Sequence, residues 1–362
     1  MTRVDDAPRR SVAATVDAFP LFARYPSLAR LPRATLGIFP SPISRIAGLR
    51  GERDIWIKRD DLDAPSFGGN KVRALEFLLG EVRPGDTLLT MGGEGSTHVL
   101  VTAAMGERLG ARTLAIRWRH DMNPTARRTA SAAEELCSSI RTTRGPISAY
   151  LAALVARSTG DARWVPPGGT NTLGMLGHVN AGLELAGQVA RGEMPMPTRV
   201  VVPFGTGGTA AGIALGLAIA GLPAQVVAAR VVPRIVASQR RLLSLAHSCA
   251  KFIARLERRP VPRVRPSHVE VVNDVYGGSY GRPLPAATAA ASYLHSTSGI
   301  LLDDSYSAKA FLAALRLPRE ETVLFWLTFA GTAVKGNTEQ ETGNRNGEGS
   351  GGRVQGSGTA SG

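Results

Sequence analysis

The sequence is poor in cysteine, and this scarcity argues against two kinds of architecture. Its 362 residues contain two cysteines, Cys137 and Cys249, which are too few for a disulfide framework. No Cys/His cluster has the spacing of a metal site, so we expect no metal. The first twenty residues contain no apolar core of the signal-peptide type. The predicted location is therefore the cytoplasm.

Acidic residues are also scarce, with 29 Asp and Glu against 43 Lys and Arg, and the formal net charge is +14. The densest basic block runs from residue 234 to 265 and contains a single acid, Glu257. A nucleic-acid surface is conceivable from charge alone. However, the block contains one aromatic residue, Phe252, and matches no known nucleic-acid motif. We therefore predict an arginine-rich solvated face and no nucleic-acid partner.

A long uncharged stretch, residues 200–222, raises the question of a membrane span. Pro203 and several glycines interrupt it, so we predict a buried strand, a tight turn and a small-residue helix instead. From Lys335 onward the chain consists mostly of Gly, Asn, Glu, Ser and Thr. Such a composition cannot bury enough apolar surface to fold, so residues 335–362 are expected to be a disordered tail.

What the sequence does contain is a regular alternation of strand and helix patterns. Residues 54–59 alternate as in a strand, and short buried-strand patterns recur at 86–90, 111–116 and 200–204. Helical periodicity lies between them, an order typical of parallel βαβ units. The apolar fraction of 43% is enough for two domains. The sequence therefore predicts a two-domain α/β protein with open, twisted, mostly parallel sheets flanked by helices.

Lys71 is the first candidate for chemistry, because it follows Gly68-Gly69-Asn70 where a glycine-rich turn enters a helix. The unpaired N–H groups and the positive dipole at a helix N-terminus disfavour a second cation. They therefore lower the pKa of the amine, which helps it act as a nucleophile or base. On local pattern alone, a surface turn lysine remains the commoner interpretation.

Two loops have the form strand, glycines, hydroxyls, helix. In the loop Gly205-Thr206-Gly207-Gly208-Thr209, backbone N–H groups and two hydroxyls can surround one anion, although an ordinary βα turn is equally compatible. The loop has neither the nucleoside-triphosphate pattern nor the full dinucleotide spacing, so a monophosphate fits better.

The second loop, Ser96-Thr97-His98, could hold a carboxylate at the start of a helix, with Ser96 placed for proton transfer. A simple Ser/Thr helix cap is the alternative interpretation. Together, a lysine at a glycine turn, a phosphate loop and a carboxylate loop indicate pyridoxal phosphate chemistry.

The same motifs carry a resemblance that extends from about residue 30 to 334. The chain is similar to the family of 1-aminocyclopropane-1-carboxylate deaminase and D-cysteine desulfhydrase, which are pyridoxal phosphate enzymes of fold type II, the tryptophan-synthase-β type. The matching segments, in chain order, are Lys58-Arg59-Asp60-Asp61-Leu62, Gly68–Arg73, Ser96-x-His98, Gly168–Asn171, Gly205–Thr209, Tyr280-Gly281-x-Pro283, Gly299–Lys309 and Val323–Phe325.

The resemblance implies a role for each of these positions. Lys71 would be the Schiff-base lysine, Ser96 the acid/base group, and Tyr280 and Tyr306 would line the substrate side. Pyridoxal phosphate would contact Lys71, Asn70, Thr97, Gly205, Thr206, Gly207, Gly208, Thr209, Ser307 and Thr328. Residues 1–73 and 175–334 would form the large cofactor-binding domain and 74–174 the small domain. A homodimer acting on a small amino acid is expected.

The chain departs from the family pattern at several positions. The usual Gln-Ser-Asn-His is Gly95-Ser96-Thr97-His98 here, so Thr97 would replace an asparagine that approaches the cofactor's ring oxygen. Ala74 stands where the family has a lysine or arginine near the phosphate. Relative to the family pattern, one residue is inserted near Phe329.

Ser307 and Thr328 guide the choice of reaction within the family. Deaminases carry Glu and Leu at these positions, whereas desulfhydrase-like members carry small hydroxyl residues. A hydroxyl beside the pyridine nitrogen leaves it unprotonated, and the weaker electron sink suits departure of a good β-leaving group. We therefore expect α,β-elimination of the D-cysteine desulfhydrase kind. Ring-opening deamination, β-replacement in specialised metabolism, and a catalytically idle cofactor- or nucleic-acid-binding relative are the alternatives.

Overall fold

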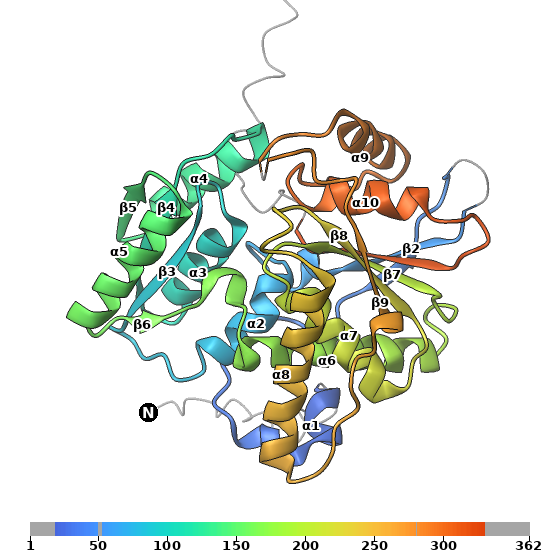
Figure 1. Cartoon of the computed structure of the whole chain (residues 1–362), viewed down its shortest axis with the longest axis horizontal. Helices are drawn as coiled ribbons and strands as arrows, with labels where there is room; N and C mark the ends of the chain where they lie inside the picture. The colour runs from blue at the N-terminus through green and yellow to red at the C-terminus, as the bar shows by residue number, and fades with distance from the viewer. Residues whose placement is uncertain (1–18, 50–52, 280, 330–362) are drawn as a thin grey trace, which may run out of the picture.

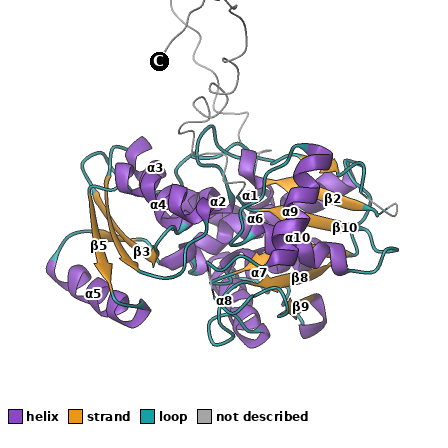
Figure 2. Cartoon of the chain, turned by 90° about the horizontal axis from the view of Figure 1, so that it is seen from above, coloured by secondary structure: helices purple, strands orange, loops and turns teal. Residues whose placement is uncertain are grey.

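The computed structural model of the chain describes residues 19–49, 53–279 and 281–329. Tyr280 and the predicted tail 335–362 lie outside these residues. The described residues form two sheets that lie side by side, each with helices on both faces (Figures 1 and 2). The predicted α/β class with mostly parallel sheets flanked by helices is therefore confirmed.

The larger sheet has six strands in the order β1-β2-β10-β7-β8-β9. All neighbours are parallel except β1, which is antiparallel to β2. Because β10 inserts between β2 and β7, it joins the early and the later segments of the chain in one sheet. The strands are β1 (Ile43–Arg45), β2 (Ile55–Arg59), β7 (Arg199–Phe204), β8 (Gln225–Arg230), β9 (Val269–Val272) and β10 (Val323–Leu327).

The smaller sheet is entirely parallel, in the order β5-β4-β3-β6. Its strands are β3 (Thr87–Gly93), β4 (Arg112–Trp118), β5 (Ser139–Thr143) and β6 (Arg163–Trp164). All four lie within the range predicted for the small domain. The domain borders themselves remain a prediction.

Helices complete the core on each sheet. One face of the large sheet packs against α1, α6, α7 and α8, and the other against α9 and α10. The small sheet packs against α3 and α4 on one face and α5 on the other. The helices are α1 (Pro20–Arg24), α2 (Asn70–Leu78), α3 (Thr97–Arg108), α4 (Pro124–Leu136), α5 (Pro146–Thr159), α6 (Thr172–Ala190), α7 (Gly208–Ala220), α8 (Gln239–Glu257), α9 (Pro285–Ser298) and α10 (Ser307–Arg316).

The uncharged stretch 200–222 forms β7, a loop and α7, as predicted. Helix α7 packs closely against α6, because a Cβ on Gly216 would lie 2.3 Å from the carbonyl oxygen of Val179. None of the described helices is both long and apolar enough to cross a membrane. The small residues of α7 therefore serve close helix packing inside the large sheet's core.

A buried cluster of charges fixes α2, the helix that carries Lys71. Arg73 pairs with Asp60 at 2.7 Å and with Glu184 of α6 at 2.9 Å, and all three side chains are buried. Trp326 of β10 donates from Nε1 to Asp60 at 2.7 Å, and Lys58 of β2 contacts Glu184 at 2.6 Å. The cluster therefore ties α2 to the large sheet and to α6.

Candidate active site

A cavity of about 380 Å³ lies between the two sheets and contains most of the predicted site residues. Its walls include the residues at or just beyond the carboxyl ends of β3, β4, β7 and β10, together with the first residues of α2, α3 and α7. Ligands of open α/β sheets bind at this edge, where strand ends and helix N-termini meet. The predicted residues that line it are Asn70, Lys71, Ser96, Thr97, Gly205, Thr206, Gly207, Thr209, Tyr306 and Thr328.

Lys71 lies in the first turn of α2 and lines this cavity. Burial lowers the pKa of its amine to about 8, although the buried carboxylate of Asp303 acts in the opposite direction and raises that pKa. Its Nζ lies 3.3 Å from Oδ1 of Asn70, and Asn70 donates from Nδ2 to Oγ1 of Thr209 at 2.7 Å. A chain of polar contacts thus connects the lysine to the loop 205–209.

The loop 205–209 has the features of an anion site. Helix α7 begins at Gly208, and its N-cap, Gly207, makes no side-chain cap hydrogen bond and has a φ of +101°. The hydroxyl of Thr206 lies 2.6 Å from that of Thr170. A Cβ on Gly208 would approach Thr170 Oγ1 to 2.8 Å, so glycine is needed for this close approach. Gly208 itself does not line the cavity; it starts the helix behind it.

The second predicted loop faces the same cavity. Ser96 is the N-cap of α3, and its side chain makes no cap hydrogen bond, which leaves the hydroxyl available to the cavity. His98 contacts Oγ1 of Thr90 through Nε2 at 2.9 Å, and its buried Nδ1 has no hydrogen-bond partner among the described residues. Burial, followed by the charge of Lys71, lowers the pKa of His98 to about 3. The imidazole is therefore neutral at physiological pH.

The structure gives physical reasons for two departures from the family pattern. Gly95 has a φ of +74°, and a Cβ there would lie 2.4 Å from the carbonyl oxygen of Ala126 at the start of α4. A side-chain amide is excluded at this position. Ala74 packs against Gly169, because a Cβ added to this glycine would lie 3.0 Å from the Cβ of Ala74. Ala74 is fully buried and does not line the cavity, so a cation at this position would lie in packed protein.

The residues around α10 are held by one carboxylate. Asp303 accepts hydrogen bonds from the N–H groups of Ser305, Tyr306 and Ser307, at 3.1, 2.7 and 2.9 Å. Ser307 is fully buried and donates from Oγ to the carbonyl oxygen of Phe329 at 2.8 Å, and it does not line the cavity. Its direct contact with the cofactor stays a prediction. Thr328 does line the cavity.

Several lining residues carried no signal in the sequence. Apolar and aromatic side chains form much of the remaining lining: Met91, Trp118, Pro146, Tyr150, Val232, Pro233, Val236, Tyr276 and Phe329. They come from both sheets and from connecting segments, with no recognisable spacing. Among the described lining residues there is one lysine, Lys71, and no Asp, Glu or Arg.

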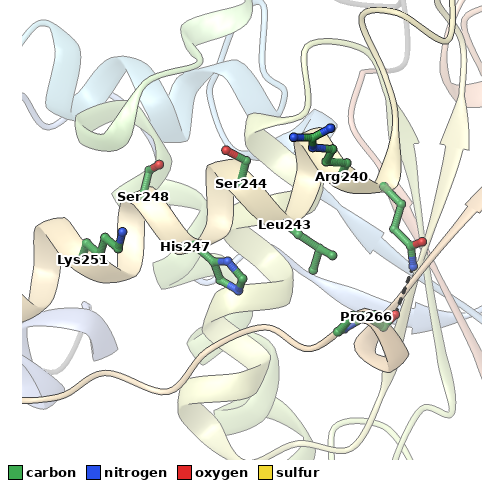
Figure 3. Close-up of a pocket in the computed structure, with 8 residues that line it drawn as sticks. Arg240, Leu243, Ser244, His247, Ser248, Lys251 and Pro266 are labelled. Atoms are coloured by element: carbon green, nitrogen blue, oxygen red, sulfur yellow. Dashed lines mark hydrogen bonds between the residues drawn. The ribbon is translucent and has the colours of Figure 1, made fainter.

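A separate shallow hollow follows the outer side of α8. Arg240, Ser244, Ser248 and Lys251 lie along the helix, with Pro266 of the following segment across from them (Figure 3). The basic residues of the block 234–265 are exposed here, as predicted for a solvated face. The hollow contains none of the predicted site residues and is distinct from the cavity around Lys71.

Comparison with known proteins agrees with this geometry. The sequence pattern of the family described as pyridoxal-phosphate dependent enzyme matches residues 34–328. The chain belongs to this family. It is therefore an enzyme that uses pyridoxal phosphate, and the resemblance found in the sequence is confirmed.

Individual members of the family and one solved structure are similar to most of this chain. A D-cysteine desulfhydrase of Serratia proteamaculans (strain 568) is 31% identical over 297 residues, covering 78% of this chain and 87% of that protein. Nocardicin C-9' epimerase of Nocardia uniformis subsp. tsuyamanensis is 36% identical over 313 residues, covering 83% and 93%. A solved ACC deaminase homologue superimposes with a TM-score of 0.71 at 27% identity, covering 86% of this chain and 96% of that one.

The residues of this enzyme's cavity fit pyridoxal phosphate. The uncapped N-terminus of α7 and the hydroxyls of Thr206 and Thr209 suit a phosphate, because they offer donors and add no carboxylate. The amine of Lys71 has a lowered pKa, as a group that bonds a carbonyl carbon requires. The buried Nδ1 of His98, unpaired among the described residues, provides a further polar group beside the same space.

The phosphate loop leads to a first prediction. Thr206→Ala removes one hydroxyl but no N–H group, so cofactor binding should weaken by about 1–3 kcal/mol. Gly207→Val should be worse, because φ is +101° and a Cβ would lie 2.9 Å from Phe204. Cofactor dissociation constants measure both effects. Gly221→Val, at the other end of α7 with φ of +73° and open space, is the matched control. Unchanged binding in both loop variants contradicts the assignment.

The lowered pKa of Lys71 leads to a second prediction. Covalent capture of pyridoxal phosphate by cofactor-free enzyme needs the neutral amine, so the rate should rise with pH and level off above about 8. A free lysine amine, whose pKa is 10.5, would still be rising there. Borohydride trapping at short times measures the profile. In Asp303→Asn the midpoint should move lower, because that charge raises the pKa of Lys71; an upward shift contradicts the geometry.

Proposed function

We propose that the enzyme catalyses α,β-elimination from a small amino acid, as the relatives named D-cysteine desulfhydrase suggest, releasing pyruvate, ammonia and the leaving group. The supporting observation is the absence of Asp and Glu from the described lining of the cavity. Pyridoxal phosphate, when bound, supplies the electron sink for loss of the Cα proton. Without a carboxylic acid beside it, that sink is weak and suits substrates with a good leaving group.

Each site residue has a proposed task. Lys71 would hold the cofactor, and its amine would remove the Cα proton of the substrate. The N-terminus of α3, with Ser96 and Thr97, binds the substrate carboxylate, and the Ser96 hydroxyl relays a proton. Tyr306 lies against the phosphate loop, since a Cβ on Gly205 would be 3.4 Å from its ring. We place the Tyr306 ring on the substrate side, with Tyr280 as its predicted companion.

The test of the reaction is a comparison of two substrates. The wild-type enzyme should release pyruvate from D-cysteine or β-chloro-D-alanine, and little 2-oxobutanoate from 1-aminocyclopropane-1-carboxylate. A Ser307→Glu, Thr328→Leu double change should shift the balance toward ring opening. The two positions are linked through Phe329, whose carbonyl accepts from Ser307, so their effects should not add. Faster ring opening than elimination in the wild type would overturn the proposal.

Epimerisation at Cα is the second candidate, because the relative named nocardicin C-9' epimerase is 36% identical over most of the chain. Lys71 and Ser96 both line the cavity and could remove and return a proton. An amino acid without a leaving group separates the two reactions. D-Alanine incubated in heavy water should stay the D-enantiomer if the enzyme only eliminates, whereas deuterated L-alanine would favour epimerisation.

We also propose three further properties on the basis of the family resemblance. They are a homodimer, domain borders at residues 73/74 and 174/175, and a cytoplasmic location. The small sheet's strands fall inside the proposed small domain. Analytical ultracentrifugation tests the dimer. Limited proteolysis tests the borders.

A further inference from the structure

The mouth of the cavity has apolar edges on both sides. The first turns of α5, on the side of the small sheet, contribute Pro146 and Tyr150 to the lining. The segment after β8, on the side of the large sheet, contributes Pro233 and Val236. Figure 2 shows α5 at the outer end of the small sheet and β8 in the large one. The two edges belong to one opening.

The side chains at these edges are unusually exposed for their type. Ile235 is 91% exposed and Ile147 is 79% exposed, and each is a chain neighbour of a lining residue. Tyr150 and Val236 are also partly open to solvent. Exposed apolar surface around a concave site is typical of a ligand-binding groove, because it is covered when the ligand binds.

The inner and outer parts of the cavity differ in character. The inner part has Lys71 and the two loops 96–98 and 205–209, which suit the cofactor's phosphate and a substrate carboxylate. The outer part has Trp118 and His120, with the prolines and aliphatic side chains of the mouth. The described lining offers no Asp, Glu or Arg to a charged substrate side chain. The mouth therefore favours a neutral group with substantial apolar area.

We propose that the substrate carries a bulky apolar leaving group, of about aryl size, which lies between Tyr150 and Val236. The inference rests on the proposed elimination and specifies the substrate for that same site. For an S-aryl cysteine, the Cα–H and Cβ–S bonds break. The proton goes to the base, the Cα electron pair forms the double bond, and the thiolate leaves with the Cβ–S pair. Water then hydrolyses the enamine to pyruvate and ammonia.

The apolar edges, and not the basicity of the leaving group, separate the two substrates. Thiophenolate and hydrogen sulfide are comparably weak bases, whereas a small thiol does not reach the apolar edges and gains nothing from them. One methylene more or less in a hydrophobic pocket changes kcat/KM by about 10–200-fold. We therefore expect S-phenyl-D-cysteine to be turned over with a kcat/KM at least about tenfold above that of D-cysteine.

The experiment compares the two substrates in wild-type enzyme and two variants, reading pyruvate. Val236→Asp places a charge at the mouth and should reduce the ratio of kcat/KM for S-phenyl-D-cysteine over D-cysteine by about tenfold. Met196→Asp is the matched control, since Met196 is similarly exposed and does not line the cavity. Its ratio and its activity should match wild type. A ratio below one in wild type, or equal ratios in both variants, overturns the inference.

A binding measurement separates this inference from the proposed reaction. D-Phenylalanine and D-alanine have no leaving group, so their dissociation constants report the pocket alone. D-Phenylalanine should bind at least about tenfold more tightly, and Val236→Asp should remove the difference. If neither cysteine substrate gives pyruvate but this preference holds, the elimination is wrong and the apolar subsite stands. If pyruvate forms and D-alanine binds as tightly, the subsite is wrong and the elimination stands.

Discussion

Replacement of Lys71 by alanine is expected to lower turnover by about 10³-fold or more, because both the covalent hold on the cofactor and the base are lost. The fold should be unaffected. The amine's hydrogen bond is to its chain neighbour Asn70, and alanine is a good helix former in the first turn of α2. Turnover, cofactor absorbance and the denaturation midpoint measure the three effects.

The control for this prediction is a second buried lysine. Lys309 in α10 is fully buried and donates to the carbonyl oxygen of Tyr276 at 2.9 Å. Burial lowers its pKa to about 8 as well, so low basicity alone does not distinguish it from Lys71. The two lysines differ in position, because Lys71 lines the cavity and Lys309 does not. Borohydride reduction and peptide mapping should label Lys71 in wild type and in Lys309→Met. A label on Lys309 contradicts the assignment.

The sequence predicted the architecture because its signals are local. Alternating and periodic apolar residues placed β2, β7 and α7 close to where the structure has them. The loops 96–98 and 205–209 were predicted for the same reason: glycines and hydroxyls at the end of a strand describe a helix N-terminus directly. Their convergence on one cavity follows from parallel strands, whose carboxyl ends meet at one edge.

The outer part of the cavity could not be predicted in this way. Trp118, Tyr150 and Val236 line one cavity because two sheets pack side by side, and no local spacing records that packing. The reasons for the departures from the family pattern at Gly95 and Ala74 could not be predicted either. Each follows from contact with a distant segment, Ala126 for one and Gly169 for the other. Such contacts become visible only in the folded chain.

The buried charge cluster under α2 was also hidden from sequence reasoning. Arg73 and Glu184 are separated by 111 positions, and a glutamate within a helix usually marks a solvated face. In the structure both are buried and paired. A charge in this setting depends on its partners, because an unpaired buried ion is strongly unfavourable.

Arg73→Met is therefore expected to reduce the free energy of unfolding by about 3–5 kcal/mol, as breaking a buried ion cluster does. The loss arises mainly from Asp60 and Glu184, which keep their burial but lose the guanidinium that contacts both. Arg191→Met is the matched control. Arg191 pairs with Glu193 at 2.7 Å on the surface, where such a pair contributes about 1 kcal/mol or less. Urea denaturation with cofactor-free enzyme measures both variants.

The pH dependence of the Arg73→Met effect tests its electrostatic origin. Burial is the largest single influence and raises the pKa of Asp60 and of Glu184, but Arg73 and Lys58 together more than offset it, so both pKa values lie below the ordinary 3.8 and 4.5. Carboxylates with lowered pKa contribute stability above their unfolded pKa and lose it as pH falls. In the variant these pKa values rise, and acid neutralises the unpaired carboxylates. The stability gap between wild type and variant should thus be full near pH 7 and narrow below about 4.5. A gap that stays constant on acidification would mean that Arg73 acts by filling space against Phe39, whose ring lies 4.2 Å from its guanidinium carbon, and not by its charge.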